Sequence, residues 1–276
     1  MDPRALARAI TAIENGASPS AVPDTSVGLV VGITGPPGAG KSTLVDALTR
    51  EIRTRKQTVA ILAVDPSSHI TGGAILGDRI RMQQHHADTG VFIRSLATRG
   101  AAGGLARTTA AISRLLRSAG FDYILVETVG VGQDEIEIAH LADLTVLVLV
   151  PGMGDDIQAL KAGVMEIAAL YVVNKSDHPG AERTEQDLRS SERNTPILHT
   201  VATTGFGIPD LLNAIDAAPR GTRPAGDPTS LAVKSIRDAL RSFESALGIK
   251  PGTLAVEFPT AGEVPIRIVR PDRTSE

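Results

Sequence analysis

The sequence predicts a three-layer α/β fold, in which helices cover both faces of a mainly parallel sheet. Apolar, β-rich runs alternate along the chain with stretches that are long enough for a crossover helix. Most of these runs are continuously apolar, as is typical of strands buried on both faces, and crossover helices connect parallel strands. We therefore expect one α/β domain at residues 26–218, between an N-terminal helical segment (1–25) and a C-terminal extension (219–276).

Seven apolar runs are the expected strands of this domain. In chain order they are "VGLVVGIT", "TVAILAVD", "VFIRSL", "DYILVET", "LTVLVLVP", "LYVVNKSD" and "PILHTVA". Crossover helices are expected between most of them, for example at residues 105–118 and 156–168. These connections are long enough to place consecutive strands parallel to one another.

Two appendages flank the predicted domain. Residues 1–16 are expected to form a helix that Asp2 caps, with Leu6, Ile10 and Ile13 along one face. The linker "APRGTRPAGDP" leads to an expected helix near residues 229–247 and then to the strand-like runs "TLAVEF" and "VPIRIV".

Composition excludes several classes of protein. The chain has 276 residues and no cysteine, which removes disulfide frameworks, thiolate metal sites and cysteine nucleophiles. The net charge is −3, arginines are scattered among acidic residues, and aromatic residues make up 3%, so we expect no nucleic-acid partner. The charged N-terminus lacks the apolar core of a signal peptide and no long apolar run occurs, so we expect a cytoplasmic protein without a membrane partner.

A phosphate-binding loop follows the first strand. "GPPGAGKST" fits the pattern G-x-x-x-x-G-K-[ST] and lies between an expected strand and an expected helix, where backbone N–H groups and a helix N-terminus meet a phosphate. Lys41 would reach the β and γ phosphates, and Ser42 would bind Mg²⁺. The expected phosphate-binding residues are Gly35, Pro36, Pro37, Gly38, Ala39, Gly40, Lys41, Ser42 and Thr43.

The stretch "NKSD" predicts the base of the nucleotide. It closes a strand at the carboxyl edge of the sheet, where ligands of open α/β sheets bind. The Asn174 amide would meet the O6/N7 edge of guanine, and the Asp177 carboxylate would meet its N1–H and N2–H₂ donors, with Lys175 between them. Adenine would leave the carboxylate without a donor, so the pair favours GTP over ATP.

Carboxylates at two strand ends are candidates for a magnesium site. Asp65 ends the run "TVAILAVD", and Glu127 ends "DYILVET". Gly130 could present its N–H to the γ-phosphate, and Asp78 lies in a glycine-bracketed segment that could reorganise when that phosphate leaves. Phosphoryl transfer depends mainly on positioning and on neutralising charge, which these groups could supply.

Together, these motifs resemble the MeaB/ArgK family of P-loop GTPases, which accompany adenosylcobalamin-dependent acyl-CoA mutases such as methylmalonyl-CoA mutase. The matching stretches, in family order, are "GITGPPGAGKST", "AVDPSS", "TGGAILGDRIRM", "FIRSLATRG", "GGLART", "ETVGVGQDE", "PGMGDDIQALKAG" and "VVNKSD". The family's proteins act as chaperones, using GTP binding and hydrolysis to gate cofactor loading or exchange in the mutase.

The resemblance implies roles for particular residues. Ser42, Asp65, Asp78 and Glu127 would complete the magnesium site directly or through water, and Lys41 and Thr43 would hold phosphate with the rest of the loop. Asp155 and Lys161 fall in the family's third switch, which responds to nucleotide and to mutase. Cobalamin would be bound by the mutase, since this chain shows no D-x-H-x-x-G motif.

Two stretches depart from the family pattern. The guanine-supporting S-A-x-x-G appears as "VATTG", so Val201, Ala202 and Thr203 would line the base, with the Ala202 N–H donating to guanine O6. The resemblance also implies a homodimer, although a proline-rich tail stands here in place of the family's longer helical dimerisation arm.

We expect slow intrinsic hydrolysis. Ras-like enzymes place a glutamine directly after the glycine of this switch to orient water, whereas here Val131 follows Gly130 and Gln133 comes later. A partner that repositions the switches should raise the rate, and Lys161 is a candidate for stabilising the transition-state charge. The alternatives are a GTPase for metal insertion into another enzyme, a P-loop kinase and a nucleotide-binding scaffold without useful hydrolysis.

Overall fold

The computed structural model describes residues 2–17, 28–65, 85, 87–97, 104–128, 141–153, 164–190, 194–218, 255–257 and 267–269. The chain divides into two compact units, Met1–Thr222 and Arg223–Glu276. The first unit contains the sheet and the helices that surround it, and the second contains a short β-ribbon.

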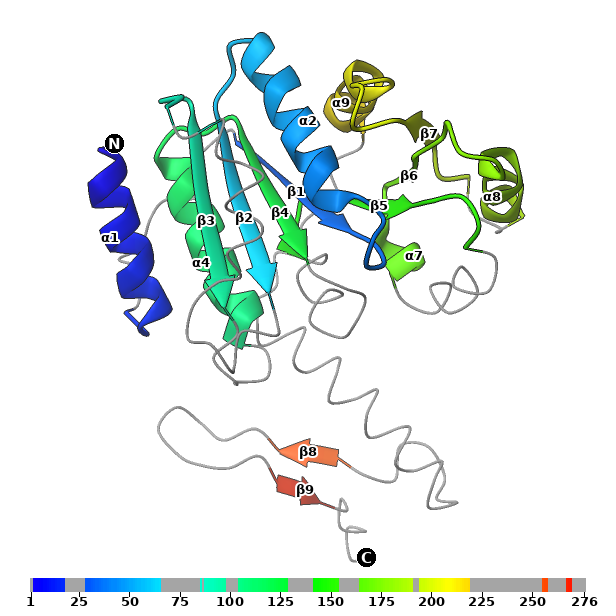
Figure 1. Ribbon diagram of the computed structural model, residues 1–276. Helices are drawn as coiled ribbons and strands as arrows, with labels where there is room; N and C mark the ends of the chain where they lie inside the picture. Colours follow the sequence, from blue (N-terminus) through cyan, green and yellow to red (C-terminus); the bar gives the residue numbers. More distant parts are fainter. Residues whose placement is uncertain are drawn as a thin grey trace, which may run out of the picture. The chain divides into compact units, whose positions relative to one another are not determined.

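The first unit is built on a seven-stranded sheet in the order β3-β2-β4-β1-β5-β6-β7 (Figure 1). Every neighbouring pair in this sheet is parallel. The strands are β1 (Leu29–Thr34), β2 (Val59–Asp65), β3 (Val91–Ala97), β4 (Tyr123–Thr128), β5 (Leu144–Leu149), β6 (Leu170–Asn174) and β7 (Ile197–Thr200). All seven apolar runs of the sequence are therefore strands, and the predicted α/β fold is confirmed.

Helices cover both faces of the sheet (Figure 1). One face packs against α2 (Lys41–Thr54) and α9 (Ile208–Ala217). The other face packs against α1 (Pro3–Glu14) and α4 (Gly104–Ser118) at one side, and α7 (Val164–Ile167) and α8 (Ala181–Arg189) at the other. The predicted helix at 105–118 is α4, and α7 falls at the end of the one predicted at 156–168, of which residues 156–163 lie outside the described residues.

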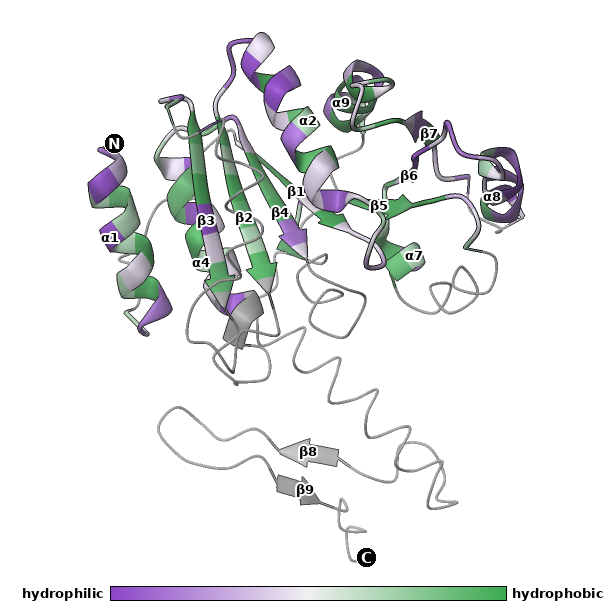
Figure 2. Cartoon of the chain, viewed as in Figure 1, coloured by the Kyte–Doolittle hydropathy of each residue, from purple (hydrophilic) through white to green (hydrophobic). Residues whose placement is uncertain are grey.

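The core lies on both sides of the central strands, as their continuous apolar runs require. β1 and β5 alternate their side chains between the α2 side, which buries Val31 and Val146, and the opposite side, which buries Val30 and Leu147. Figure 2 shows the strands as mostly hydrophobic while polar residues gather on the outer surfaces of the helices. Helices pack on both faces of the sheet, so the loops at the ends of its strands are the parts that can bind a ligand.

The N-terminal helix α1 is part of the first unit's core. The Asp2 carboxylate accepts hydrogen bonds from the N–H groups of Arg4 and Ala5, which confirms the predicted cap. Leu6 and Ile10 are buried in the same cluster as the apolar residues of α4 and β4. An ion pair between Arg94 on β3 and Glu14 fastens the end of α1 to the edge strand of the sheet.

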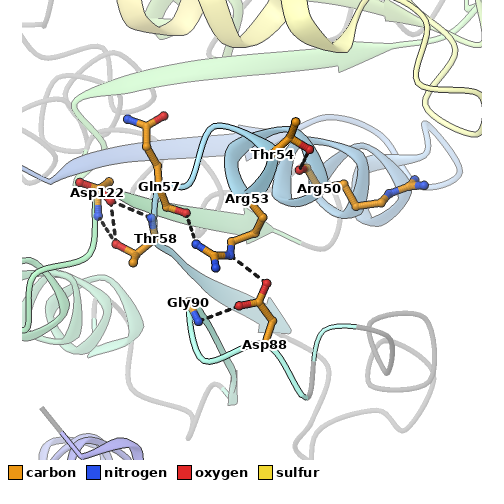
Figure 3. A network of polar contacts seen from close by, with 8 residues as sticks. All are labelled: Arg50, Arg53, Thr54, Gln57, Thr58, Asp88, Gly90 and Asp122. Atoms are coloured by element: carbon orange, nitrogen blue, oxygen red, sulfur yellow. Dashed lines mark hydrogen bonds and ion pairs between the residues drawn. The ribbon is translucent and has the colours of Figure 1, made fainter.

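A polar network holds the C-terminal end of α2 against the starts of β2 and β3 (Figure 3). Arg53 donates to the Asp88 carboxylate at 2.8 Å and to the Gln57 carbonyl at 2.6 Å. The second carboxylate oxygen of Asp88 accepts from the Gly90 N–H at 2.8 Å. A Cβ atom at Gly90 would lie 2.2 Å from the Arg53 guanidinium carbon, so a side chain there would displace the guanidinium from this position. The end of α2 is thereby fixed at the amino edge of the sheet.

The second unit contains an antiparallel pair, β8 (Ala255–Glu257) and β9 (Arg267–Val269). These strands fall in the runs "TLAVEF" and "VPIRIV", which were predicted to be strand-like. The helix predicted near 229–247 lies outside the described residues. Among the helices that the structure describes, none has both the length and the apolar character needed to cross a lipid bilayer.

We predict that Ile10→Ala lowers the free energy of unfolding by about 2–5 kcal/mol, because it leaves a cavity under α1. Ile10 is completely buried, whereas Ile13 on the same helix is only partly buried. Ile13→Ala is therefore the matched control and should lose clearly less. Denaturant unfolding of the two variants measures the difference, and equal losses would show that α1 is not packed as described.

The network in Figure 3 also predicts a pH dependence of stability. Hydrogen bonds from Arg53 and from the Gly90 N–H hold the pKa of the Asp88 carboxyl below its usual value. A carboxyl whose pKa is lower in the folded protein stabilises the fold above its unfolded pKa and loses that contribution as the pH falls through its folded pKa.

Asp88→Asn should therefore lower the Tm at pH 7, and its difference from the unchanged protein should shrink below about pH 4. Thermal unfolding followed by circular dichroism from pH 7 to pH 3 measures this. The control is Asp210→Asn, at an exposed position in the first turn of α9. A Tm difference for Asp88→Asn that is independent of pH would contradict the stabilising ion pair.

Candidate functional site

The phosphate loop joins β1 to α2 at the carboxyl edge of the sheet, and the last three residues of its motif, 41–43, form the start of α2. Gly35 and Gly40 have φ values of 145° and 85°, which disfavour residues with a side chain. A Cβ atom at Gly35 would lie 2.1 Å from the Val148 carbonyl oxygen, and one at Gly40 would lie 2.5 Å from the Asn174 amide nitrogen. The loop therefore needs glycine at both positions. It also places the N-terminus of α2 at the sheet edge, where the free backbone N–H groups of the helix can bind an anion.

Lys41 is buried within this loop, with 7% of its surface exposed. Its ammonium donates to the Gly35 carbonyl at 2.7 Å and to the Pro36 carbonyl at 3.0 Å. The side chain thus folds back across the loop that the sequence predicts to hold phosphate. To reach the β and γ phosphates, the ammonium would have to exchange these two carbonyl oxygens for phosphate oxygens. Its positive charge already lies at the loop, so only a short movement of the side chain is needed.

Ser42 and Glu127 meet at the start of α2. The Ser42 hydroxyl donates to one Glu127 carboxylate oxygen at 2.6 Å, and Glu127 is 2% exposed. The carboxylate comes from the carboxyl end of β4, which pairs directly with β1. A hydroxyl and a carboxylate are hard oxygen ligands, the kind that Mg²⁺ prefers, and Mg²⁺ usually keeps several waters and phosphate oxygens besides. This donor set fits the magnesium ion that the sequence implies.

The Asn174 side chain, at the end of β6, connects the phosphate loop to the end of β7 and the loop after it. Its amide nitrogen donates to the Ala39 carbonyl of the phosphate loop at 2.9 Å. Its amide oxygen accepts from the Thr200 hydroxyl at 3.1 Å and from the Ala202 N–H at 3.2 Å. Asn174 is 2% exposed. These contacts fix the orientation of the amide, so that its nitrogen is turned toward the phosphate loop and one N–H remains for a further acceptor.

Lys175 and Asp177 follow Asn174 on the turn after β6. Lys175 has a φ of 55°, which is uncommon for a residue other than glycine, and its ammonium donates to the Gly38 carbonyl at 3.0 Å. Asp177 is exposed. The turn therefore lies over the phosphate loop with its carboxylate accessible, an arrangement that could receive the donors of a guanine.

The loop Val201–Gly207 supplies the third side of the site. The N–H of Val201 donates to the Phe206 carbonyl at 3.1 Å, which closes the loop before α9 begins. Gly207 is tightly enclosed, since a Cβ there would lie 2.0 Å from the His199 carbonyl oxygen. Thr203 is exposed. The Ala202 N–H, which was expected to donate to guanine O6, is bonded to Asn174, so a contact with O6 would have to share this hydrogen.

Several predicted site residues lie outside the described residues. They are Asp78, Gly130, Asp155 and Lys161. Asp65 is the last residue of β2, and the structure describes its backbone alone. The predicted residues that the structure brings together are thus those of the phosphate loop, Glu127, the "NKSD" turn and the loop after β7.

Sequence reasoning missed two buried polar contacts, one of them at the site. Thr200 is completely buried and holds the Asn174 oxygen, but a single threonine at a strand end carries no recognisable signal. His85 pairs with Asp46 of α2 at 2.8 Å, and no motif in the sequence indicates this pair. Within the described ranges no group of three or more His, Cys, Asp or Glu side chains could hold a metal ion.

Comparison with known proteins shows one family over most of the chain. The family model for the methylmalonyl-CoA mutase-associated GTPase MeaB matches residues 6–239. A Pyrococcus horikoshii protein, named as a candidate GTPase, is 50% identical over 231 residues, which cover 78% of this chain and 73% of that protein. The GTPase ArgK of Escherichia coli is 44% identical over 149 residues, or 54% of this chain and 45% of that protein.

A mouse protein and two solved structures are also similar to this chain. The mouse mitochondrial "methylmalonic aciduria type A homolog" is 45% identical over 147 residues, which cover 53% of this chain and 35% of that protein. Among solved structures, a "LAO/AO transport system kinase" gives a TM-score of 0.61 at 25% identity, with 90% of this chain and 80% of that chain covered. The hydrogenase maturation factor HypB of Archaeoglobus fulgidus gives a TM-score of 0.55 at 19% identity, with coverages of 78% and 97%. That likeness concerns the fold alone.

The contacts of Asn174 generate a prediction for Thr200→Val. The variant loses one hydrogen bond to the amide oxygen, worth about 0.5–1.5 kcal/mol, so GDP affinity should fall by about 2- to 13-fold. Titration calorimetry with GDP and Mg²⁺ measures the affinity, and thermal unfolding shows whether the fold survives.

The control for this experiment is Thr204→Val. The Thr204 hydroxyl bonds the Val201 carbonyl within its own turn and does not contact Asn174. GDP affinity should change less than about twofold in this variant, since such a change corresponds to well under 1 kcal/mol. Equal affinity losses in the two variants would show that Thr200 has no special part in orienting the amide.

Proposed function

The chain belongs to the MeaB family of methylmalonyl-CoA mutase-associated GTPases, and we propose that it is a GTP-hydrolysing chaperone of an adenosylcobalamin-dependent acyl-CoA mutase. Its GTPase activity follows from the family and from relatives of that class. The mutase as client is our proposal, and the family match over residues 6–239 is the observation that carries it. The protein would use bound GTP to gate loading, protection or exchange of the mutase's cofactor.

The geometry of the base site supports guanine as the preferred base. The Asn174 amide is held with its nitrogen on the phosphate-loop side and its oxygen bonded to Thr200, and an N–H on that side suits acceptors such as guanine O6 and N7. Asp177 is exposed on the same turn and could accept from guanine N1–H and N2–H₂. Adenine offers an amino group where the Asn174 N–H needs an acceptor, and leaves the carboxylate unpaired, so it should bind less well.

Several groups of this chain would act during hydrolysis. Water attacks the γ-phosphorus while the bond to the bridging oxygen breaks, giving GDP and phosphate. Lys41 would exchange its loop carbonyls for phosphate oxygens and neutralise part of their charge. Ser42 and Glu127 would hold Mg²⁺, and we propose that Asp65 and Asp78 complete this site directly or through water. The ion, when bound, neutralises charge that develops on the phosphates.

The remaining proposed residues connect hydrolysis to a partner. The Gly130 N–H would contact the γ-phosphate, and Asp155 and Lys161 would form the switch that responds to the mutase. No glutamine follows Gly130 directly to orient the attacking water, so slow turnover is expected until the partner repositions this region. Lys161 would then stabilise the transition state. Cobalamin would be bound by the mutase and not by this chain.

The proposal predicts that the client mutase stimulates GTP hydrolysis. Phosphate release should be measured for the full chain alone, and with an adenosylcobalamin-dependent mutase from the same organism in cofactor-free and cofactor-loaded forms. We expect at least about tenfold stimulation, equivalent to about 1.4 kcal/mol of barrier, that differs between the two mutase forms. Lys161→Ala should lose the stimulation, while Arg183→Ala, at an exposed position on α8, should keep it.

The opposite outcomes separate the alternatives. A rate that no form of the mutase changes would remove the client assignment and leave a guanine-nucleotide switch with another partner. Transfer of the γ-phosphate to a small acceptor in preference to water would favour a kinase, and stimulation by a metalloenzyme precursor would favour a role in metal insertion.

A further inference from the structure

Three buried threonine hydroxyls lie behind the candidate site and have no hydrogen-bond partner among the described residues. Thr34 and Thr109 are each 1% exposed and Thr128 is 2% exposed. The hydroxyl oxygen of each is fully enclosed and bonds to no group in the part of the chain that the structure describes. Buried polar groups are nearly always hydrogen-bonded, because an unpaired one loses its interactions with water without replacement. A group of such hydroxyls in one place therefore needs an explanation.

The sheet register indicates that Thr34 and Thr128 are close to each other. The last pair of β1 and β4 is Ile33 with Glu127, and Thr34 and Thr128 are the next residue of each of these parallel strands. Ile33 lies in the cluster on the α2 side, whereas Val126 lies in the cluster on the α4 side. Since successive side chains of a strand point to opposite faces, both threonines point to the side that α4 covers.

Thr109 faces the same place from α4. It precedes Ile112 by one helical turn, and Ile112 and Leu116 are buried against Ile124 and Val126 of β4. α4 begins near the carboxyl ends of the strands (Figure 1), so the turn before Ile112 lies toward the end of β4, where Thr128 is. The three hydroxyls thus come from β1, β4 and α4, and we infer from register and face that they approach one another beneath the first half of α4.

We propose that Thr34, Thr109 and Thr128 enclose a binding site for a buried water molecule. Internal waters typically make about three hydrogen bonds to buried polar groups that would otherwise be unpaired, and three hydroxyls can supply these bonds as donors or acceptors. The three side chains are neutral, so they could not offset the desolvation of an ion, and a water satisfies them without adding charge.

The site goes beyond nucleotide hydrolysis and concerns the support of the strands. Thr34 directly precedes Gly35, whose carbonyl accepts from Lys41, and Thr128 directly follows Glu127, which accepts from Ser42. The bound water would tie these two strand ends to α4 from the face opposite the nucleotide. Its hydrogen bonds would be the contacts that align the two ends with each other.

The sign of a Thr→Val effect tests the proposal. Valine has the shape of threonine without the hydroxyl, so replacing a truly unpaired buried hydroxyl should be neutral or stabilising. If the hydroxyls hold a water, Thr34→Val, Thr109→Val and Thr128→Val each remove one of the water's hydrogen bonds and weaken its binding to the other two hydroxyls, so each should lower the Tm of the full chain by about 2–4 °C. The triple variant removes every hydroxyl, so its Tm loss should be clearly smaller than the sum of the single losses.

Thr49→Val is the matched control. Thr49 is also completely buried, but its hydroxyl donates to the Val45 carbonyl of its own helix at 2.7 Å, so its effect should simply add to the others. A high-resolution crystal structure should show one ordered water within hydrogen-bond distance of all three oxygens. Single variants that raise or keep the Tm, single losses that add up in the triple variant, or a crystal structure without this water would overturn the proposal.

Discussion

The site depends on the side-chain amide of Asn174, which is buried between the phosphate loop and the loop after β7. A buried amide is stable only when its donors and acceptors are paired, and here the partners are the phosphate loop, the Thr200 hydroxyl and the backbone after β7. Because one side chain contacts both loops, the proposed places for the base and for the phosphates depend on the same hydrogen bonds. A shift of one loop would therefore displace the other.

The parallel sheet makes this meeting possible. β1 lies between β4 and β5, and β6 and β7 follow at one side, so the loops after β1, β4, β6 and β7 all emerge at the same carboxyl edge. The helix α2 begins at this edge with Lys41 and ends at the opposite edge, where Arg53 and Asp88 hold it. Both ends of the helix are thus fixed. The phosphate loop, which lies between β1 and α2, is therefore held by a strand on one side and by a fixed helix on the other.

Local rules explain what could be predicted from the sequence. Continuous apolar runs revealed every strand of the main sheet, and the glycine pattern before Lys41 revealed the phosphate loop, because each depends on residues close together in the chain. The strand order, the part played by Thr200, and the pairing of Arg53 with Asp88 depend on residues that meet only after folding, and neither threonine nor a surface ion pair has a diagnostic pattern. The proposed switch residues were predicted from family resemblance and lie outside the described residues.

The close approach of Gly40 to Asn174 limits how the base preference could be redesigned. A side chain at position 40 would strike the amide, and a different side chain at position 174 would release the Ala39 carbonyl and the loop after β7. The two positions are far apart in the chain, but neither can be changed without disturbing the other. Asp177 is exposed on its turn, so its replacement should disturb the packing less. A laboratory seeking an orthogonal nucleotide for this scaffold would therefore begin at Asp177 and leave Asn174 unchanged.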